Sequence, residues 1–215
     1  MVKAVDLIED IKVKINGKSI AVIGAGGLGG YIIGLTSRLG LSKIFIFDGD
    51  LFTTSNIDRQ LYCQKDTLGR NKAEVAAESC SAIGVTETIA IQDYFGEEYF
   101  DLIKDVDCVV DATDNVTTRR LLEKFGEAYS IPIIHGAIDG MYGHVAVVRP
   151  GDKTITKLYR VEVRKPGKTF SFVPSLIASI QVSQMTKLLS GGRTLRKGEL
   201  LIVDFATSNT QIINI

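Results

Sequence analysis

Three glycines at a fixed spacing are the first residues that indicate chemistry. Gly24, Gly26 and Gly29 form a G-x-G-x-x-G segment that follows a β-branched run, residues 19–23, and precedes a predicted helix. In this context Gly24 allows a tight turn, Gly26 lets the backbone approach a phosphate group, and Gly29 lets the helix pack on the strand. Backbone N–H groups at the start of the helix attract the anion. The segment therefore predicts a phosphate-binding loop.

An acidic residue ends the second predicted strand, residues 43–47. Asp48 lies 24 residues after Gly24, close to the spacing at which a carboxylate accepts hydrogen bonds from a ribose hydroxyl. The glycine loop and this carboxylate together predict a site for an adenosine nucleotide. They do not by themselves distinguish NAD from ATP.

The segment from Asp50 to Lys72 favours ATP. It contains the polar residues Asn56, Asp58, Arg59, Gln60, Arg70 and Lys72. Attack on an α-phosphate builds negative charge on the phosphoryl oxygens and on the leaving pyrophosphate, and Arg and Lys side chains stabilise that charge. Asp114 follows the fourth predicted strand, where open α/β sheets bind ligands, and a carboxylate there can hold Mg²⁺ together with phosphate oxygens.

Strand and helix patterns alternate along the chain and indicate how these groups are brought together. Strands are expected at residues 19–23, 43–47, 86–91, 106–110, 131–135 and 143–148, and helices at 2–13, 31–39, 71–83, 117–129 and 175–189. Residues 199–205 and 211–215 predict a closing hairpin. The pattern is typical of an α/β fold: a Rossmann-like, doubly wound, mostly parallel sheet with helices on both faces and a C-terminal antiparallel extension.

The length of 215 residues fits one domain. We expect a single domain over residues 1–215. Within it, residues 1–17 hold an N-terminal helix, residues 19–150 form the nucleotide-binding core, and residues 151–215 form a C-terminal extension on the substrate side. Residues 154–169 are polar and basic and carry no clear pattern.

The composition excludes several classes of protein. Hydrophobic residues make up 45% of the chain, so it can bury a core, and its 25 basic and 25 acidic residues give no net charge. This balance argues against a dedicated nucleic-acid or membrane-surface binder. The three cysteines form no C-x-x-C pair, which excludes a disulfide framework and a four-cysteine zinc site. No apolar stretch approaches the roughly 20 residues of a membrane span, and acids occupy the place of a signal-peptide core. We expect a cytoplasmic protein.

Four ordered motifs together resemble the ThiF/MoeB/HesA family, the bacterial relatives of ubiquitin-activating enzymes. The run from Ser55 to Gln60 is similar to the family's SNxxRQ signature. The glycine loop, the run from Gly69 to Ala73 and the run from Asp111 to Asn115 match the other motifs in order. Weaker similarity continues to the end of the chain.

The resemblance implies an adenylyltransferase that uses ATP and Mg²⁺. Its substrate would be the C-terminal Gly-Gly carboxylate of a small ubiquitin-like sulfur-carrier protein, ThiS-like or MoaD-like, and its products an acyl-adenylate and pyrophosphate. By family habit the enzyme would be a homodimer. The resemblance assigns catalysis to Arg59, Lys72 and Asp114, and Mg²⁺ binding to Asp114. It assigns nucleotide binding to Gly24, Gly26, Gly27, Gly29, Asp48, Asp50, Asn56, Arg59, Gln60, Lys72, Asp114 and Asn115. Asp48 would bind the ribose, and Asn56 and Gln60 would position the cations on the phosphates.

The sequence departs from the family pattern at three points. It lacks the two C-x-x-C pairs that bind a structural zinc in many members, so we expect no zinc. It also lacks an N-terminal arginine that reaches the partner subunit's site, and Arg119 or Arg120 could replace it. No cysteine follows Cys108, so thioester chemistry at the usual place is not expected. Cys63 is either a reactive thiol or, as we favour, a small core filler, and His135 either touches substrate or is satisfied locally.

Other functions remain open on these residues. The substrate could be a small carboxylate, a peptide or a tRNA base, although the neutral charge argues against tRNA unless residues 153–168 form a basic patch. The chain could instead be a nucleotide-binding partner subunit that has lost its chemistry, which the presence of Arg59, Lys72 and Asp114 opposes. An NAD-dependent oxidoreductase is disfavoured because nothing supplies its substrate site.

Overall fold

A computed structural model describes residues 4–160 and 167–215. Its helices are α1 (Ala4–Ile15), α2 (Gly27–Thr36), α3 (Lys72–Ser81), α4 (Phe100–Ile103), α5 (Val116–Tyr129), α6 (Thr154–Leu158) and α7 (Phe172–Leu189). Its strands are β1 (Ser19–Ile23), β2 (Lys43–Phe47), β3 (Glu87–Ile91), β4 (Cys108–Asp111), β5 (Ile133–Asp139), β6 (Tyr142–Val148), β7 (Glu199–Asp204) and β8 (Asn209–Asn214). Two short 3-10 helices cover Thr54–Asn56 and Glu97–Tyr99.

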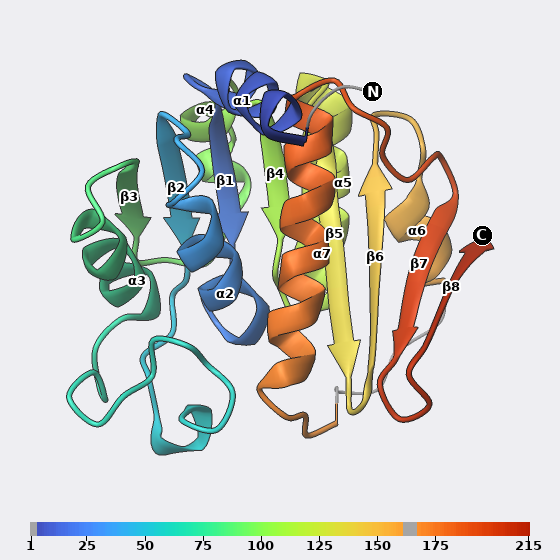
Figure 1. The fold of residues 1–215 in the computed structure, drawn as a ribbon. Coiled ribbons are helices and arrows are strands. Elements are labelled where there is room, and N and C mark those ends of the chain that lie inside the picture. The colour runs from blue at the N-terminus through green and yellow to red at the C-terminus, as the bar shows by residue number, and fades with distance from the viewer. Residues whose placement is uncertain (1–3, 161–166) are drawn as a thin grey trace.

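The strands of this described part form one eight-stranded sheet in the order β3-β2-β1-β4-β5-β6-β7-β8 (Figure 1). The five strands from β3 to β5 are parallel, and β6, β7 and β8 are added antiparallel. The predicted fold class is therefore confirmed, including its antiparallel extension.

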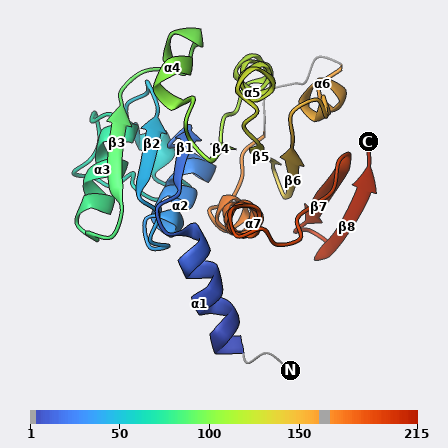
Figure 2. The ribbon, with the colours of Figure 1, turned by 90° about the horizontal axis from the view of Figure 1, so that it is seen from above.

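Helices cover the sheet on both faces (Figure 2). Helices α2, α3 and α7 contribute to one hydrophobic core, which includes the fully buried Ile32, Ala76 and Met185. Helices α4, α5 and α6 contribute to a second core on the other face, where Phe125 is surrounded by aromatic rings. The central strands are buried on both sides because each face meets its own core, which explains their nearly continuous apolar sequences.

The carboxyl ends of β1, β2 and β4 meet at one edge of the sheet (Figure 1). The long connection from β2 to α3, residues 48–71, gathers at the same edge. This edge therefore collects the glycine loop after β1, the acids after β2 and the Asp111–Asn115 segment after β4. In a parallel sheet such an edge is where ligands bind.

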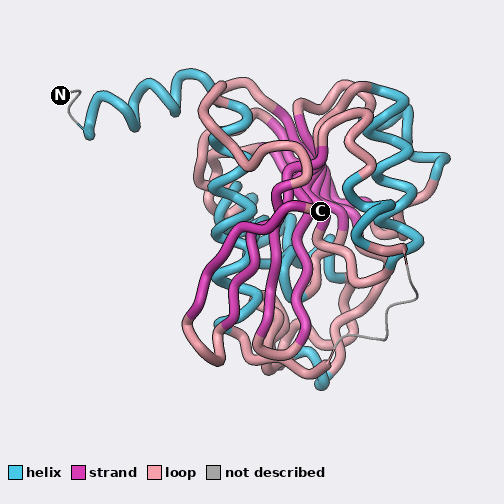
Figure 3. The backbone as a smooth tube through the Cα atoms, turned by 90° about the vertical axis from the view of Figure 1, so that its right-hand side faces the viewer, coloured by secondary structure: helices cyan, strands magenta, loops and turns pink. Residues whose placement is uncertain are grey.

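Helix α1 extends away from the body of the molecule (Figure 3). It meets the rest of the chain at its C-terminal end, where Ile15 is buried, whereas Leu7, Ile8 and Val13 are exposed. In the described part of the chain, no helix has the length and apolar character needed to span a membrane.

Several predicted boundaries were wrong. Helix α2 runs over Gly27–Thr36 instead of 31–39, because its glycines pack closely against neighbouring backbone and side chains and this packing overrides their low helix propensity. Strand β5 runs over Ile133–Asp139 instead of 131–135, since its pairing with β6 continues to the Asp139–Tyr142 turn. Helix α7 begins three residues early, at Phe172, with Pro174 in its first turn, where proline is tolerated.

Candidate nucleotide-binding site

A cavity of about 1010 Å³ opens at this edge of the sheet. Most of the predicted nucleotide-binding residues line it: Gly24, Gly26, Gly27, Asp48, Asp50, Arg59, Gln60, Lys72, Asp114 and Asn115. The two other predicted residues, Gly29 and Asn56, are not part of its lining. Gly29 is buried in α2, and Asn56 holds the loop entrance by accepting hydrogen bonds from the backbone N–H and the hydroxyl of Thr53 at 3.0 and 3.1 Å.

The glycine loop has the geometry that its spacing predicts. Gly24 has φ +97°, in the left-handed region, and a Cβ there would lie 2.8 Å from the Ala112 carbonyl oxygen. A Cβ on Gly29 would lie 1.8 Å from the Gly24 carbonyl oxygen, so α2 can pack here only with glycine. Gly26 caps α2 without any side-chain hydrogen bond, which leaves the first N–H groups of the helix directed at the cavity.

Asp48 links the ends of β1 and β2. Its carboxylate accepts hydrogen bonds from the backbone N–H of Ala25 at 2.7 Å and of Asp50 at 2.9 Å. Burial raises the pKa of this carboxyl group, against the opposing effect of Lys72 and the two backbone donors. The carboxylate therefore helps to shape the glycine loop, and its remaining lone pairs face the cavity.

Lys72, the first residue of α3, is only 7% exposed. Its Nζ donates to Asp50 Oδ2 at 2.8 Å, and the Tyr94 hydroxyl donates to Asp50 Oδ1 at 2.5 Å. Partial burial of Asp50 raises its pKa, but these two hydrogen bonds outweigh that effect and lower it overall. Asp50 thus holds a cation at the cavity wall. Sequence reasoning missed Tyr94, since a single aromatic residue after β3 carries no local signal.

Arg59 and Gln60 approach the cavity from the connection between β2 and α3. The Arg59 Nη1 donates to the Ser55 carbonyl oxygen and to Asp58 Oδ1, both at 2.7 Å. Gln60 is 9% exposed, and its Oε1 is buried without a hydrogen-bond partner among the described residues. An unpaired buried amide oxygen costs free energy, so this atom is suited to a donor from a bound ligand.

Asp114 and Asn115 lie at the start of α5. The Asn115 side chain caps the helix by accepting a hydrogen bond from the Thr118 backbone N–H at 2.8 Å. Asp114 is exposed at the cavity, and no hydrogen bond or ion pair of its carboxylate is found among the described residues. That carboxylate is available to a ligand. The same residues hold no cluster of three or more His, Cys, Asp or Glu side chains suited to a metal ion.

Three further residues, His135, Arg119 and Arg120, have alternative predicted roles. His135 is fully buried and hydrogen-bonded to Asp111, so it is satisfied locally. Arg119 is 6% exposed and bonded within its own chain, and Arg120 donates to the Tyr159 carbonyl oxygen. The guanidinium groups of both arginines are engaged within the chain, and both residues line the cavity; their role towards a partner subunit stays a prediction.

Cys63 is 5% exposed, and burial raises the pKa of its thiol. Its Sγ faces the Thr53 carbonyl oxygen at 3.4 Å. These surroundings oppose the reactive thiolate and support the interpretation of Cys63 as a core filler.

Comparison with known proteins identifies the family of this chain. A model described as the ThiF family matches residues 3–215. The chain is 31% identical over 180 residues to the sulfur carrier protein ThiS adenylyltransferase of Bacillus subtilis, covering 79% of this chain and 54% of that protein. It is 28% identical over 197 residues to the SAMP-activating enzyme E1 of Haloferax volcanii, covering 86% of this chain and 72% of that enzyme. It spans less than half, 45%, of the adenylyltransferase and sulfurtransferase MOCS3-1 of Zea mays.

Among solved structures, the fold is similar to that of E. coli MccB crystallised with ATP. The TM-score is 0.81 at 18% identity, covering 96% of this chain and 66% of that one. PaaA is similar at a TM-score of 0.78. These neighbours establish the fold, whereas the family model establishes descent. Because that model matches nearly the whole chain, this protein belongs to the ThiF family.

Proposed function

We propose that this chain is an ATP-dependent adenylyltransferase that activates the C-terminal Gly-Gly carboxylate of a small ubiquitin-like sulfur-carrier protein. The observation that carries the proposal is the meeting, in one cavity, of a glycine loop, two cations and an unpaired carboxylate. The names of the relatives from Bacillus subtilis and Haloferax volcanii support the reaction and the class of carrier.

The nucleotide is held chiefly by backbone groups. The N–H groups at the start of α2 bind phosphate oxygens above Gly26, where no side chain intervenes. Asp48 accepts hydrogen bonds from the ribose, and the buried Gln60 Oε1 gains the donor that it lacks among the described residues. These contacts are preorganised because the glycine turn and the Asp48 carboxylate hold each other in place.

The two cations stabilise charge that develops during the reaction. Lys72 and Arg59 are held by carboxylates, at 2.8 Å from Asp50 and 2.7 Å from Asp58 respectively. Arriving phosphates compete for the same donors, so each cation transfers from a carboxylate to the phosphate oxygens. The carboxylate of the carrier attacks the α-phosphorus, an acyl–phosphate bond forms, and the bond to the leaving pyrophosphate breaks. No general base is required because the attacking carboxylate is already ionised.

Asp114 fits a magnesium ion that arrives with ATP. Mg²⁺ favours one or two carboxylates together with phosphate oxygens and water, and the unpaired, exposed carboxylate of Asp114 supplies such a ligand. When bound, the ion neutralises phosphate charge. We propose no structural zinc, because the sequence lacks the C-x-x-C pairs that would bind it.

The carrier tail is proposed to lie beside the C-terminal extension. Gly167 and Thr169 line the cavity together with Ala137 and Ile138 of β5, and they are hydrogen-bonded to Asp139 and Gly140 at the end of that strand. This arrangement supports the division of the single domain into a nucleotide-binding core and a substrate-side extension. We also propose the family's homodimer and a cytoplasmic location for the enzyme.

ATP–pyrophosphate exchange tests the proposal directly. The purified chain is assayed with Mg²⁺, with and without a candidate carrier that ends in Gly-Gly, beside Asp114→Ala. Asp105→Ala is the matched control, because Asp105 is also an exposed acid but lies away from the cavity. We expect exchange that depends on the carrier, is lost in Asp114→Ala and is kept in Asp105→Ala.

Other outcomes lead to the remaining functions. ATP binding without exchange, with any carrier, would favour a small carboxylate, peptide or tRNA-base substrate, or a non-catalytic partner subunit. The basic stretch suggested for tRNA lies partly outside the described residues. Absence of ATP binding would refute the assignment of the glycine loop.

A further inference from the structure

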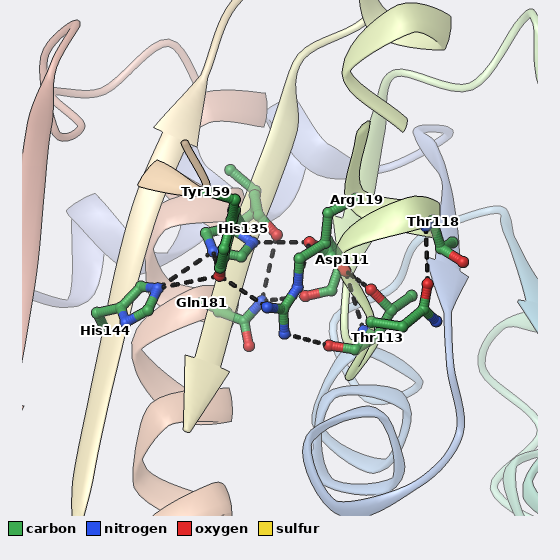
Figure 4. Close-up of polar contacts among 10 residues, drawn as sticks. Asp111, Thr113, Thr118, Arg119, His135, His144, Tyr159 and Gln181 are labelled. Carbon is green, nitrogen blue, oxygen red and sulfur yellow. Dashed lines mark hydrogen bonds and ion pairs between the residues drawn. The ribbon is translucent and has the colours of Figure 1, made fainter. Parts of the chain in front are cut away.

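A closed ring of hydrogen bonds (Figure 4) extends from the lining of the cavity, where Thr113, Arg119 and Tyr159 lie, into the buried interior. The Thr113 hydroxyl and backbone N–H donate to Asp111 Oδ1 at 2.7 and 2.9 Å, and His135 Nδ1 donates to Asp111 Oδ2 at 2.7 Å. The Tyr159 hydroxyl contacts His135 Nε2 at 3.0 Å. Arg119 completes the ring, because Nη1 donates to the Tyr159 hydroxyl at 2.8 Å and Nη2 to the Thr113 carbonyl oxygen at 2.6 Å.

Every donor and acceptor in this ring can be assigned consistently. With a proton on Nδ1, a neutral His135 donates to Asp111 and accepts from the Tyr159 hydroxyl through Nε2, while that hydroxyl accepts from Arg119. Asp111 and His135 are fully buried, and Arg119 and Tyr159 are 6% and 5% exposed. A buried polar network of this kind is rigid when every member is satisfied and costly when one bond is lost.

The ring is attached to the backbone next to Asp114. Both the N–H and the C=O of Thr113 are bonded within it, and the Thr113 carbonyl belongs to the peptide unit that joins Thr113 to Asp114. The ring therefore restrains the backbone that carries the Asp114 carboxylate. Thr113, Arg119 and Tyr159 belong to the lining of the cavity, whereas Asp111 and His135 do not.

Tyr159 is the ring member that comes from outside the parallel half of the fold. It follows α6, whereas Asp111, Arg119 and His135 belong to β4, α5 and β5. Its ring also lies under the guanidinium of Arg119, 4.9 Å from the centroid. Arg119 Nε has no hydrogen-bond partner among the described residues, although it forms an ion pair with Asp111 Oδ2 at 3.9 Å. The Tyr159 hydroxyl and the Thr113 carbonyl oxygen are therefore the two hydrogen-bond acceptors of this guanidinium.

We propose that Tyr159 is a positioning residue for the Mg²⁺–nucleotide complex, acting on Asp114 through Arg119 and Thr113. The inference rests on the proposed function, in that it takes Asp114 as the magnesium ligand. Without the hydroxyl, Arg119 Nη1 loses its acceptor, and the guanidinium that donates to the Thr113 carbonyl oxygen is held less firmly. Asp114 then samples more positions, and binding of the metal–nucleotide complex weakens.

Tyr159→Phe tests this, since it removes only the hydroxyl and keeps the ring under Arg119. Tyr129→Phe is the matched control: Tyr129 lies in the aromatic cluster of α5, and its hydroxyl has no hydrogen bond among the described residues. Calorimetry measures the Kd of ATP with Mg²⁺ and with EDTA. With Mg²⁺ we expect Tyr159→Phe to weaken binding about tenfold, the order expected for one lost buried hydrogen bond, and Tyr129→Phe to leave it unchanged. With EDTA both variants should bind as the unmodified chain does.

A double-mutant cycle with Asp114→Asn separates positioning from a general loss of structure. If Tyr159 acts through Asp114, Tyr159→Phe changes the Kd less than about twofold once Asp114 is already Asn. An equal loss with EDTA, an equal loss in the Asp114→Asn background, or no loss at all would overturn the proposal while leaving the adenylation reaction intact. An unmodified chain that shows no magnesium-dependent ATP binding would overturn both. If Tyr159→Phe does not fold, Arg119→Lys, which keeps the charge but cannot bond both partners, takes its place and carries the same expectations.

Discussion

The same substitution at two glycines of the loop, three residues apart, is expected to have opposite consequences. At Gly29 an alanine Cβ would lie 1.8 Å from the Gly24 carbonyl oxygen, well short of the 3.0 Å below which real contacts essentially do not occur. At Gly26 the nearest atom to an alanine Cβ is Gln60 Nε2, at 3.5 Å, an ordinary contact. The first change obstructs the fold, whereas the second obstructs only the approach of a phosphate.

The magnitudes follow from these distances. In Gly29→Ala the helix must move away from β1 by more than 1 Å, because Gly24 is held in place by the hydrogen bond that its N–H donates to the Phe47 carbonyl oxygen at 2.8 Å. Overpacking of this kind costs about 1–3 kcal/mol or more, and a loss of about 3 kcal/mol lowers the Tm of a chain of this size by roughly 6–12 °C. In Gly26→Ala the fold is expected to lose no more than about 1 kcal/mol, while one lost charge-assisted hydrogen bond to phosphate weakens ATP binding about tenfold or more.

Thermal unfolding followed by circular dichroism and calorimetric titration with ATP measure the two effects separately. Gly26→Ala should unfold within a few degrees of the unmodified chain and bind ATP poorly, and Gly29→Ala should unfold much earlier or fail to accumulate. Unimpaired ATP binding by Gly26→Ala would refute the placement of the phosphate over this residue. A Gly29→Ala variant of normal Tm would refute the close packing of α2 on the loop.

Three further predictions concern buried groups. Burial, together with His135 and Arg119 beside it, lowers the pKa of His144 to about 3, against the opposing charge of Asp111, and Tyr159 is its remaining polar neighbour. Because this value lies below the unfolded pKa of about 6.5, the stability linked to His144 is present above pH 6.5 and is lost as the pH falls towards 3. Urea titrations measure the difference in unfolding free energy between the unmodified chain and His144→Gln, which should shrink by as much as about 1.4 kcal/mol per pH unit between pH 6.5 and 5. A difference that stays constant with pH would contradict the lowered pKa of His144. All three cysteines are buried, so Ellman's reagent should label them slowly in the native chain and completely in guanidinium, and rapid native labelling of one thiol would contradict the account of Cys63. Lys72→Met should reduce pyrophosphate exchange about 10²-fold or more, because it removes a buried cation from the cavity, while its Tm should stay close to that of the unmodified chain. Exchange activity within threefold of the unmodified chain would show that Lys72 takes no part in the reaction.

Much of the site could be predicted from contiguous residues. The roles of Gly24 and Gly29 depend on the local turn and on the helix that follows it directly, and both are realised in the structure. Asp48 was predictable because the carboxyl ends of neighbouring parallel strands must meet at one edge. The ends of α2 were not predictable, since the burial of Leu28, Gly29 and Gly30 against other segments, and not their own propensity, extends that helix.

The sequence by itself determined the alternation of strands and helices and the chemistry of the glycine loop, because both depend on residues that are close together in the sequence. Only the tertiary structure decided which distant polar groups meet. Asp111 and His135 become partners because β4 and β5 are adjacent and in register at these two residues. Tyr159 joins them from a segment that showed no pattern of its own, and Tyr94 reaches Asp50 across 44 residues. Such contacts depend on the strand order and on the packing of the two cores. Neither can be predicted from the local spacing of residues.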